Sequence, residues 1–317
     1  MLELVRQAEV LGFDSAWVSE HHGTSDGYLP SLLTMLAAFA AVTERIELGT
    51  GVVLTPLHDP IRLAEDCAVV DQLSAGRLIL GLGLGWREEE FRMLRIPIKE
   101  RLARHVETVE ILRRAWTGER FSFEGRVFRY EDVRVAPPPY RAGGPAIYLG
   151  GYTEASARRV GEIADGYVVD ADDTDEVVSS MRLGEDAARA AGRDPTAIGL
   201  ALMANAWVSE SPDAWSEIRE GVIHQIGAYD AWDEEHDTPS HDSLEPRRLS
   251  EDELRDSTFA GTPDEVASEL SKRLAPFHER KELHLIVRMH YPGMELRPAS
   301  RAMELFAERV LPALREA

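Results

Sequence analysis

The stretch that decides the fold is residues 45–84, RIELGTGVVLTPLHDPIRLAEDCAVVDQLSAGRLILGLGL. It opens with an apolar strand pattern at Arg45–Leu54 and continues with a helical pattern at Asp59–Leu73. A tight turn then leads into a second apolar strand at Leu78–Leu84. Two buried strands joined by one helix form a βαβ unit, and such units build parallel sheets.

The rest of the chain repeats this alternation of strand and helix. One helix precedes the first strand, because residues 1–11 carry apolar side chains at helical spacing and Gly12 ends the pattern. The predicted strands are Ser15–Ser19, Arg45–Leu54, Leu78–Leu84, Ala146–Leu149, Gly166–Asp170, Ile198–Val208 and Leu283–Arg288. The other predicted helices are Tyr28–Val42, Asp59–Leu73, Glu100–Trp116, Thr153–Ala164, Glu176–Ala191, Asp213–Ala228, a capped helix from Thr262 to Leu274, and Ser300–Leu314.

This order predicts an α/β fold of the (β/α)8 TIM barrel type, which has eight parallel strands. We find seven strands, each followed by a helix, so we expect the first strand of the barrel to be missing from this chain. We predict a single domain over residues 1–317. Two insertions interrupt it, at about 121–135, where alternation indicates a hairpin, and at about 229–257, an acidic loop.

Composition restricts the class of protein. The formal net charge is −21, which would repel a polyanion, so we expect no nucleic-acid partner. No run of about 18 apolar residues is present, and we expect no membrane association. The single cysteine, Cys67, cannot form an internal disulfide, and no signal peptide is visible at the start, so we expect a cytoplasmic protein.

Functional residues of an α/β barrel lie where strands end, and the first strand here ends in Glu20-His21-His22. Adjacent side chains on a strand point to opposite sides, so two neighbouring histidines seldom bind one metal ion, and we expect no metal site. Two interpretations remain open for the pair. Either both rings simply pack, or one ring faces the barrel mouth and exchanges a proton near neutral pH.

Glycines mark the ends of the next two strands. Gly49 and Gly51 interrupt a buried strand, which indicates either a bulge or tight packing against a helix. Gly81, Gly83 and Gly85 alternate, so they share one strand face and could leave a shelf for a flat ring. Trp86 follows as a pocket wall or as a core residue, and its position rules out a GxGxxG dinucleotide motif.

The strand that ends at Leu149 is followed by Gly150, Gly151 and Tyr152, and then by a helix with Thr153 as the expected N-cap. Free backbone N–H groups at such a position can bind phosphate, and barrels often bind phosphate after a late strand. An ordinary capped turn is the alternative, which the acidic first helical residue, Glu154, favours.

Together these segments resemble the bacterial-luciferase-like flavin-dependent oxidoreductases. The resemblance covers nearly the whole chain. It rests on the order and spacing of GFDSAWVSEHHG (12–23), residues 45–86, PAIYLGGYTEASARRVGEIADGY (145–167), FAGTPDEVASEL (259–270) and ELFAERVLPAL (304–314).

The resemblance implies a barrel that binds a flavin in its mouth. It places the catalytic histidine at His21, with His22 beside it, and a non-proline cis peptide at Gly51-Val52 beneath the ring. It also places the phosphate region at Gly150–Ser156. We therefore predict the following cofactor-binding residues: Thr50, Gly51, Val52, Gly83, Gly85, Trp86, Gly150, Gly151, Tyr152 and Thr153.

Three functions are compatible with this family. The first is a monooxygenase that uses dioxygen and reduced FMN, supplied by a separate flavin reductase, to oxidise a small organic substrate. The second is a hydride-transfer oxidoreductase that uses the deazaflavin coenzyme F-420. The third is a flavin-binding protein without turnover. We expect the first, because EHH and the stretch HDPIRLAEDCAVVDQLSAGR look closer to luciferase-type members. Family members are often homodimers, and the two insertions are expected to set the substrate.

Overall fold

The computed structural model describes residues 1–317 except 171–172, 212, 235–248 and 317, and it does not describe the side chains of 230–234. Within the described residues, its centre is a nine-stranded sheet in which every ladder is parallel. The strands are β1 (Ser15–Val18), β2 (Glu47–Thr50), β3 (Val53–Leu54), β4 (Leu78–Gly83), β7 (Ala146–Gly150), β8 (Gly166–Asp170), β9 (Gly199–Val208), β10 (Phe259–Gly261) and β11 (Leu283–Arg288). The predicted parallel α/β architecture is therefore confirmed.

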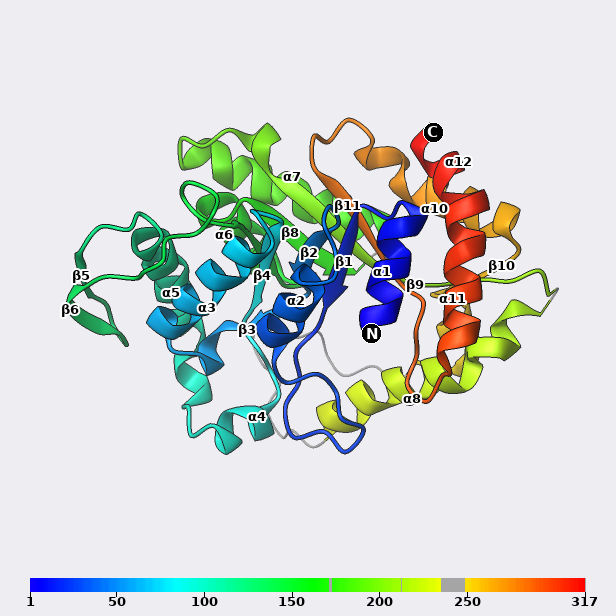
Figure 1. Ribbon diagram of the computed structural model, residues 1–317, viewed down its shortest axis with the longest axis horizontal. Coiled ribbons are helices and arrows are strands. Elements are labelled where there is room, and N and C mark those ends of the chain that lie inside the picture. Colours follow the sequence, from blue (N-terminus) through cyan, green and yellow to red (C-terminus); the bar gives the residue numbers. More distant parts are fainter. Residues whose placement is uncertain (171–172, 212, 235–248, 317) are drawn as a thin grey trace.

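The sheet curves into a barrel with helices on its outside (Figure 1). Its order is β1-β2-β4-β7-β8-β9-β10, and β11 pairs with β9. No ladder among the described residues joins β11 to β1, and β1 is the first strand, after helix α1 (Leu2–Leu11). Side chains bridge the two strands instead, because Ser15 Oγ lies 3.4 Å from His284 Nδ1 and the Trp17 ring lies 5.6 Å from the His284 ring.

The helices follow from local sequence signals. Thr262 caps α10 with a reciprocal bond to Glu265, and Pro263 occupies its first turn, as predicted. The remaining helices of four or more residues are α2 (Leu32–Ala40), α3 (Pro60–Leu73), α4 (Glu88–Met93), α5 (Arg101–Ala115), α6 (Glu154–Ile163), α7 (Thr174–Ala190), α8 (Ala214–Glu234), α9 (Glu251–Asp256), α11 (Leu296–Leu305), the π-helical turn Phe306–Val310 and α12 (Leu311–Glu316).

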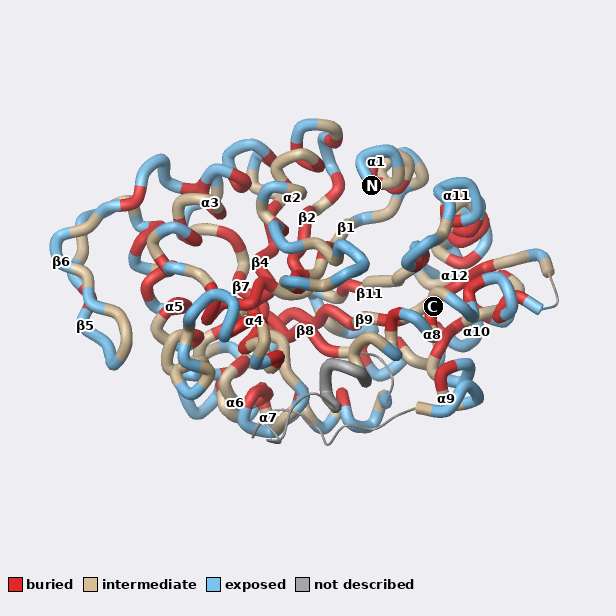
Figure 2. The backbone as a smooth tube through the Cα atoms, turned by 90° about the horizontal axis from the view of Figure 1, so that it is seen from below, coloured by how far each residue is buried: buried red, intermediate tan, exposed pale blue. Residues whose placement is uncertain are grey.

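Buried residues gather on the central strands (Figure 2). Two of the three clusters that they form line the faces of the sheet, and the third joins Leu54 and Leu57 to Phe91 of α4. The larger cluster lies between the strands and the outer helices and includes Leu36, Leu80 and Leu200. The smaller cluster fills the barrel interior, where Trp17 and Met203 pack against a buried group of Ile79, Tyr148, Val168 and Ala201. Side chains therefore fill the barrel interior below its mouth, and the space for a site is at the carboxyl ends of the strands.

Several predicted boundaries are wrong. The strand predicted over 45–54 divides into β2 and β3 around a cis peptide at Gly51-Val52, at the position that the resemblance implied. The sequence analysis also missed α4 and the three-residue strand β10. Helix α8 continues to Glu234, and α9 lies inside the segment predicted as one long loop, whose residues 235–248 fall outside the described part.

The insertion at 121–135 does form the predicted hairpin, with β5 (Phe121–Glu124) paired antiparallel to β6 (Arg129–Val133). It projects from the barrel on the side of α5 (Figure 1).

In the described residues no helix combines the length and apolar character that crossing a bilayer would require.

Candidate active site at the barrel mouth

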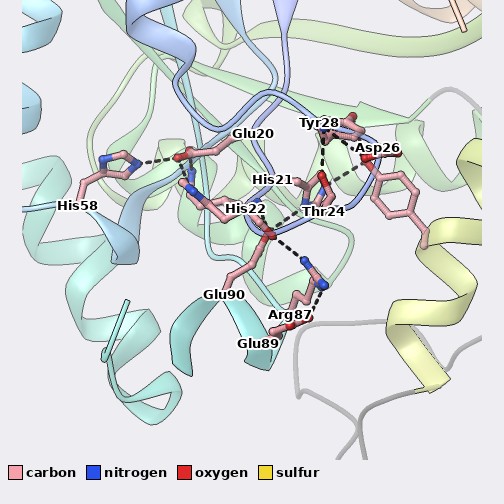
Figure 3. A network of polar contacts seen from close by, with 12 residues as sticks. Glu20, His21, His22, Thr24, Asp26, Tyr28, His58, Arg87, Glu89 and Glu90 are labelled. Atoms are coloured by element: carbon pink, nitrogen blue, oxygen red, sulfur yellow. Dashed lines mark hydrogen bonds and ion pairs between the residues drawn. The ribbon is translucent and has the colours of Figure 1, made fainter. Parts of the chain in front are cut away.

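His21 lies at the carboxyl end of β1 and is buried, with 6% of its surface exposed. Its Nδ1 lies 3.1 Å from Glu90 Oε1, and its Nε2 lies 3.0 Å from the hydroxyl oxygen of Tyr229 (Figure 3 shows the surroundings of His21). A carboxylate can only accept, so Nδ1 carries the proton. In the neutral ring Nε2 is then the free base, and it accepts a hydrogen bond from the tyrosine.

Aromatic side chains surround the His21 ring. Tyr28 and Tyr229 contact it edge to face, with ring centroids 4.8 and 5.2 Å away, and their hydroxyls lie 3.2 Å apart. Burial, followed by the charge of Tyr28, raises the pKa of Tyr229 well above its ordinary value, so this hydroxyl keeps its proton. Trp86 adds a third ring, 6.5 Å from Tyr229. The reactive nitrogen of His21 therefore faces an aromatic wall from which water is largely excluded.

His22 points to a different carboxylate, as expected for adjacent residues after a strand. Its Nε2 donates to Glu20 Oε1 at 2.8 Å, and His58 Nε2 donates to the same oxygen at 2.9 Å. Burial tends to raise the pKa of Glu20, but the hydrogen bonds from His22 and His58 outweigh it and lower the pKa to about 2. The hydrogen bond to Glu20 raises the pKa of His22 against the opposing effect of burial. Glu20 is therefore an ionised, almost fully buried carboxylate.

Glu90 comes from α4, the short helix that the sequence analysis missed. Its side chain is 1% exposed, and its Oε1 also accepts from the backbone N–H of His22 at 2.9 Å. Arg87, from the same segment, donates to the His22 carbonyl at 2.7 Å and pairs with Glu89. The stretch REEEFRM has no apolar periodicity, so nothing in the sequence could show that its third glutamate turns inward.

The glycines of β4 do not form the open shelf that we expected. A Cβ on Gly81 would lie 2.0 Å from the Thr50 carbonyl oxygen, and a Cβ on Gly83 would lie 2.4 Å from Val52 Cγ2. The space is thus filled by the bulge of the neighbouring strand, and Thr50 fixes that bulge by donating to the Gly81 carbonyl at 2.7 Å. The glycines allow the bulge to enter the mouth, and contact of Gly83 with a cofactor stays a prediction.

The bulge itself presents bare backbone to the mouth. Gly51 and Val52 are only half-buried, whereas Thr50 and Val53 on either side are buried. A Cβ at Gly51 would point towards Met203, 3.7 Å from its sulfur. Trp86 and Gly85 are likewise half-buried beside it, and Phe91 packs against Gly85. A flat cofactor would therefore meet main chain and Val52 on one side, which fits the residues predicted there.

The predicted phosphate region lies at the end of β7. Gly150 and Gly151 are half-buried, and Thr153 is the N-cap of α6, as predicted. Its Oγ1 accepts from Ser156 N at 3.2 Å, and Ser156 Oγ accepts from Thr153 N at 2.9 Å. This capping box satisfies part of the helix terminus, so the structure contains the capped turn that was the alternative, and a phosphate there stays a prediction.

The wall of the mouth next to β7 carries the polar ends of β8, β9 and β11. Asp170 is paired in register with Met203, and Arg288 with Asn205. Arg288 Nη1 donates to Asn205 Oδ1 at 3.4 Å, and the Tyr152 hydroxyl donates to Asp170. Burial raises the pKa of Asp170, although the bond from Tyr152 and the charge of Arg288 oppose this. This wall therefore offers one acid and one cation to a bound molecule.

Two further histidines, His105 and His284, have structural roles. His105 is 1% exposed, bonds to Thr55 Oγ1 at 3.0 Å, and burial lowers its pKa to about 3. His284 packs between β1 and β11, as described above. The described residues contain no group of three or more His, Cys, Asp or Glu placed to hold a metal ion.

With this geometry established, comparison with known proteins is informative. The sequence profile of the luciferase-like monooxygenase family matches residues 1–276. The chain belongs to that family. It is accordingly an enzyme of the luciferase-like oxidoreductase kind, and the family resemblance of the sequence is confirmed.

Individual relatives of this luciferase-like protein divide between two activities. An F420-dependent glucose-6-phosphate dehydrogenase of Nakamurella multipartita is 29% identical over 99% of this chain and 92% of its own length. One from Kineococcus radiotolerans is 30% identical over 98% of this chain and 91% of its own length. The crystal structure of the monooxygenase RslO1 from Streptomyces bottropensis superposes with a TM-score of 0.82 at 28% identity, covering 100% of this chain and 92% of that one.

Proposed function

We propose that this protein is a deazaflavin (F420)-dependent oxidoreductase that removes a hydride from an alcohol. The observation that carries the reaction type is the His21–Glu90 pair, in which Nε2 already lies 3.0 Å from a hydroxyl oxygen, that of Tyr229. Named relatives that match almost the whole chain are F420-dependent dehydrogenases, which favours the deazaflavin over the FMN that we expected from the sequence. A dehydrogenase of this type needs no separate flavin reductase.

The residues of the mouth can perform the proton half of such a reaction. His21 Nε2 accepts the proton of the substrate hydroxyl as the carbonyl forms, and Glu90 holds the proton on Nδ1 and stabilises the resulting imidazolium. A bound deazaflavin supplies the acceptor for the hydride that leaves the carbinol carbon. Tyr28, Tyr229 and Trp86 exclude water from this position.

Cofactor binding is proposed at the backbone-lined side of the mouth. Gly51 and Val52 would support the ring, and Gly150–Thr153 would contact the phosphate end. Apart from the exposed Tyr152 ring, these groups are main-chain atoms and small side chains, as a flat ring with a phosphate tail requires.

A reduced-FMN monooxygenase is the second candidate. The observation that favours it is the similarity to RslO1, which extends over the whole chain. In that case His21 would serve as a proton donor or acceptor towards the substrate, and dioxygen would be consumed.

Titration of the purified protein with the deazaflavin, FMN and reduced FMN, followed by fluorescence quenching, tests the proposal. We expect the deazaflavin to bind at least tenfold more tightly than either form of FMN. His21→Ala should reduce turnover by about 10²-fold or more and leave deazaflavin affinity within about twofold. Glu90→Gln should reduce turnover in the same way, because Nδ1 loses its carboxylate. Tight binding of reduced FMN alone would reject the proposal.

A further inference from the structure

Glu20 is a buried carboxylate that the proposed chemistry does not use. It is 3% exposed, and three donors from three segments converge on it: His22 from the loop after β1, Leu54 N from β3, and His58 from the turn before α3. The Leu54 amide donates to Oε2 at 2.6 Å, and the two histidine rings share Oε1 (Figure 3). One side chain therefore joins the histidine loop to the strand that follows the cis bulge.

The position of His21 depends on these neighbours. His22 is held through its ring by Glu20, through its N–H by Glu90 and through its carbonyl by Arg87. His21 sits between Glu20 and His22 in sequence, and its own N–H donates to the Leu29 carbonyl at 3.2 Å. The backbone on both sides of His21 is thus fixed. Glu20 connects this loop to the segment that follows the bulge, because it also accepts from the Leu54 amide.

The bulge depends on the same carboxylate. On one side of the cis peptide, Thr50 donates to the Gly81 carbonyl at 2.7 Å. On the other side, the amide of Leu54 finds its acceptor in Glu20, and Thr55 Oγ1 donates to the Gly83 carbonyl at 3.1 Å. Residues 51–53 are therefore held between three partners. Gly51 N donates to the Val18 carbonyl of β1 at 2.8 Å, β3 pairs with β4, and Glu20 accepts from the Leu54 amide just beyond them.

We propose that Glu20 is a positioning residue, which holds the loop bearing His21 and the bulge at Gly51-Val52 in one fixed relative geometry. The base and the surface proposed to lie beneath the cofactor come from neighbouring strands. The β1–β2 ladder and the Gly51 N–H, which donates to the Val18 carbonyl at 2.8 Å, align these strands, and Glu20 joins the loops that follow them. In functional terms the inference rests on the proposed function, because the proton acceptor and the hydride acceptor must face the same substrate carbon. A misplacement of about 1 Å between such groups costs about 10²-fold in rate.

A carboxylate is required for this role. All three groups around it donate, and an ionised carboxylate can accept all three. An amide at position 20 would turn one N–H₂ group towards a donor, either Leu54 N or the two rings. Glu20→Gln therefore keeps the shape of the side chain but removes the acceptor for the donors at one of its two ends, either Leu54 N or the two histidine rings.

The experiment compares Glu20→Gln with Asp71→Asn. Asp71 is an equally buried carboxylate that accepts from the Arg141 amide at 2.9 Å, in α3 at the opposite end of the barrel. His58→Gln is the milder second variant, because it replaces one imidazole donor by a permanently neutral amide and leaves the Glu20 carboxylate in place. Amide hydrogen exchange is measured over residues 51–55 in all four proteins without cofactor, and the histidine rings are titrated by NMR.

We expect exchange at residues 51–55 to accelerate at least tenfold in Glu20→Gln and less in His58→Gln, with no change in Asp71→Asn. The pKa of His22, which faces Glu20 and Glu90, should fall in Glu20→Gln. With glucose 6-phosphate as the probe substrate, kcat should fall at least tenfold while KM changes less than threefold. Unchanged exchange over 51–55 in Glu20→Gln would overturn the inference. The exchange and titration results decide it even if the deazaflavin does not bind, in which case only the proposed function fails.

Discussion

At the scale of single residues, the site consists of two histidine–carboxylate pairs placed side by side. His21–Glu90 faces the mouth, and His22–Glu20 faces the loops behind it. The sequence identified both histidines, because two such rings after a strand are rare enough to attract attention. It did not identify the carboxylate partner of His21, because Glu90 lies 69 residues away and its neighbours Glu88 and Glu89 look the same in sequence.

The low pKa of Glu20 predicts a specific dependence of stability on pH. Its pKa of about 2 in the folded protein lies below the ordinary value of 4.5. The ionised group therefore stabilises the fold above pH 4.5, and this contribution disappears as the pH falls towards 2. We expect the difference in unfolding free energy between the unaltered protein and Glu20→Gln, measured by urea denaturation, to shrink over this range. A difference that is independent of pH would show that the charge does not contribute.

At the scale of elements, prediction succeeded where a pattern is long and failed where a segment is short. The long strand β9 and the helices α3, α5 and α10 match their apolar periods. Strand β10 has three residues and α4 six, too few for a period to show. Helix α2 begins at Leu32 and not at Tyr28, because Pro30 has no backbone N–H to donate and disfavours helical backbone at the residue before it.

The capping boxes of α6 and α10 provide a matched test of the phosphate region. Thr153 and Thr262 cap two helix starts through reciprocal bonds with the third helical residue, and only Thr153 belongs to the region proposed for the phosphate. Thr153→Ala and Thr262→Ala should each cost about 1 kcal/mol in unfolding free energy, measured by urea denaturation. We expect only Thr153→Ala to weaken deazaflavin binding, by about threefold or more. Equal affinities in the two variants would place the phosphate elsewhere.

At the scale of the whole molecule, the order of elements was sufficient to predict the barrel and the end of it that carries the site. The composition of the site could not be predicted in the same way. Tyr229 meets His21 across 208 residues of sequence, and the expectation that it begins a loop concealed its place in α8. The glycines of β4 were expected to form a shelf for a flat ring, but they accommodate a neighbouring bulge, which only the register of the sheet reveals.

We propose that this barrel transfers hydride from an alcohol and does not activate dioxygen. The most direct measurement mixes the protein with oxidised deazaflavin and glucose 6-phosphate or simple secondary alcohols that carry deuterium at the carbinol carbon. We predict that deuterium appears on the reduced deazaflavin, with no oxygen uptake, and that His21→Ala slows the transfer about 10²-fold. Oxygen uptake with reduced FMN, together with an absence of deuterium transfer to the deazaflavin, would contradict the account.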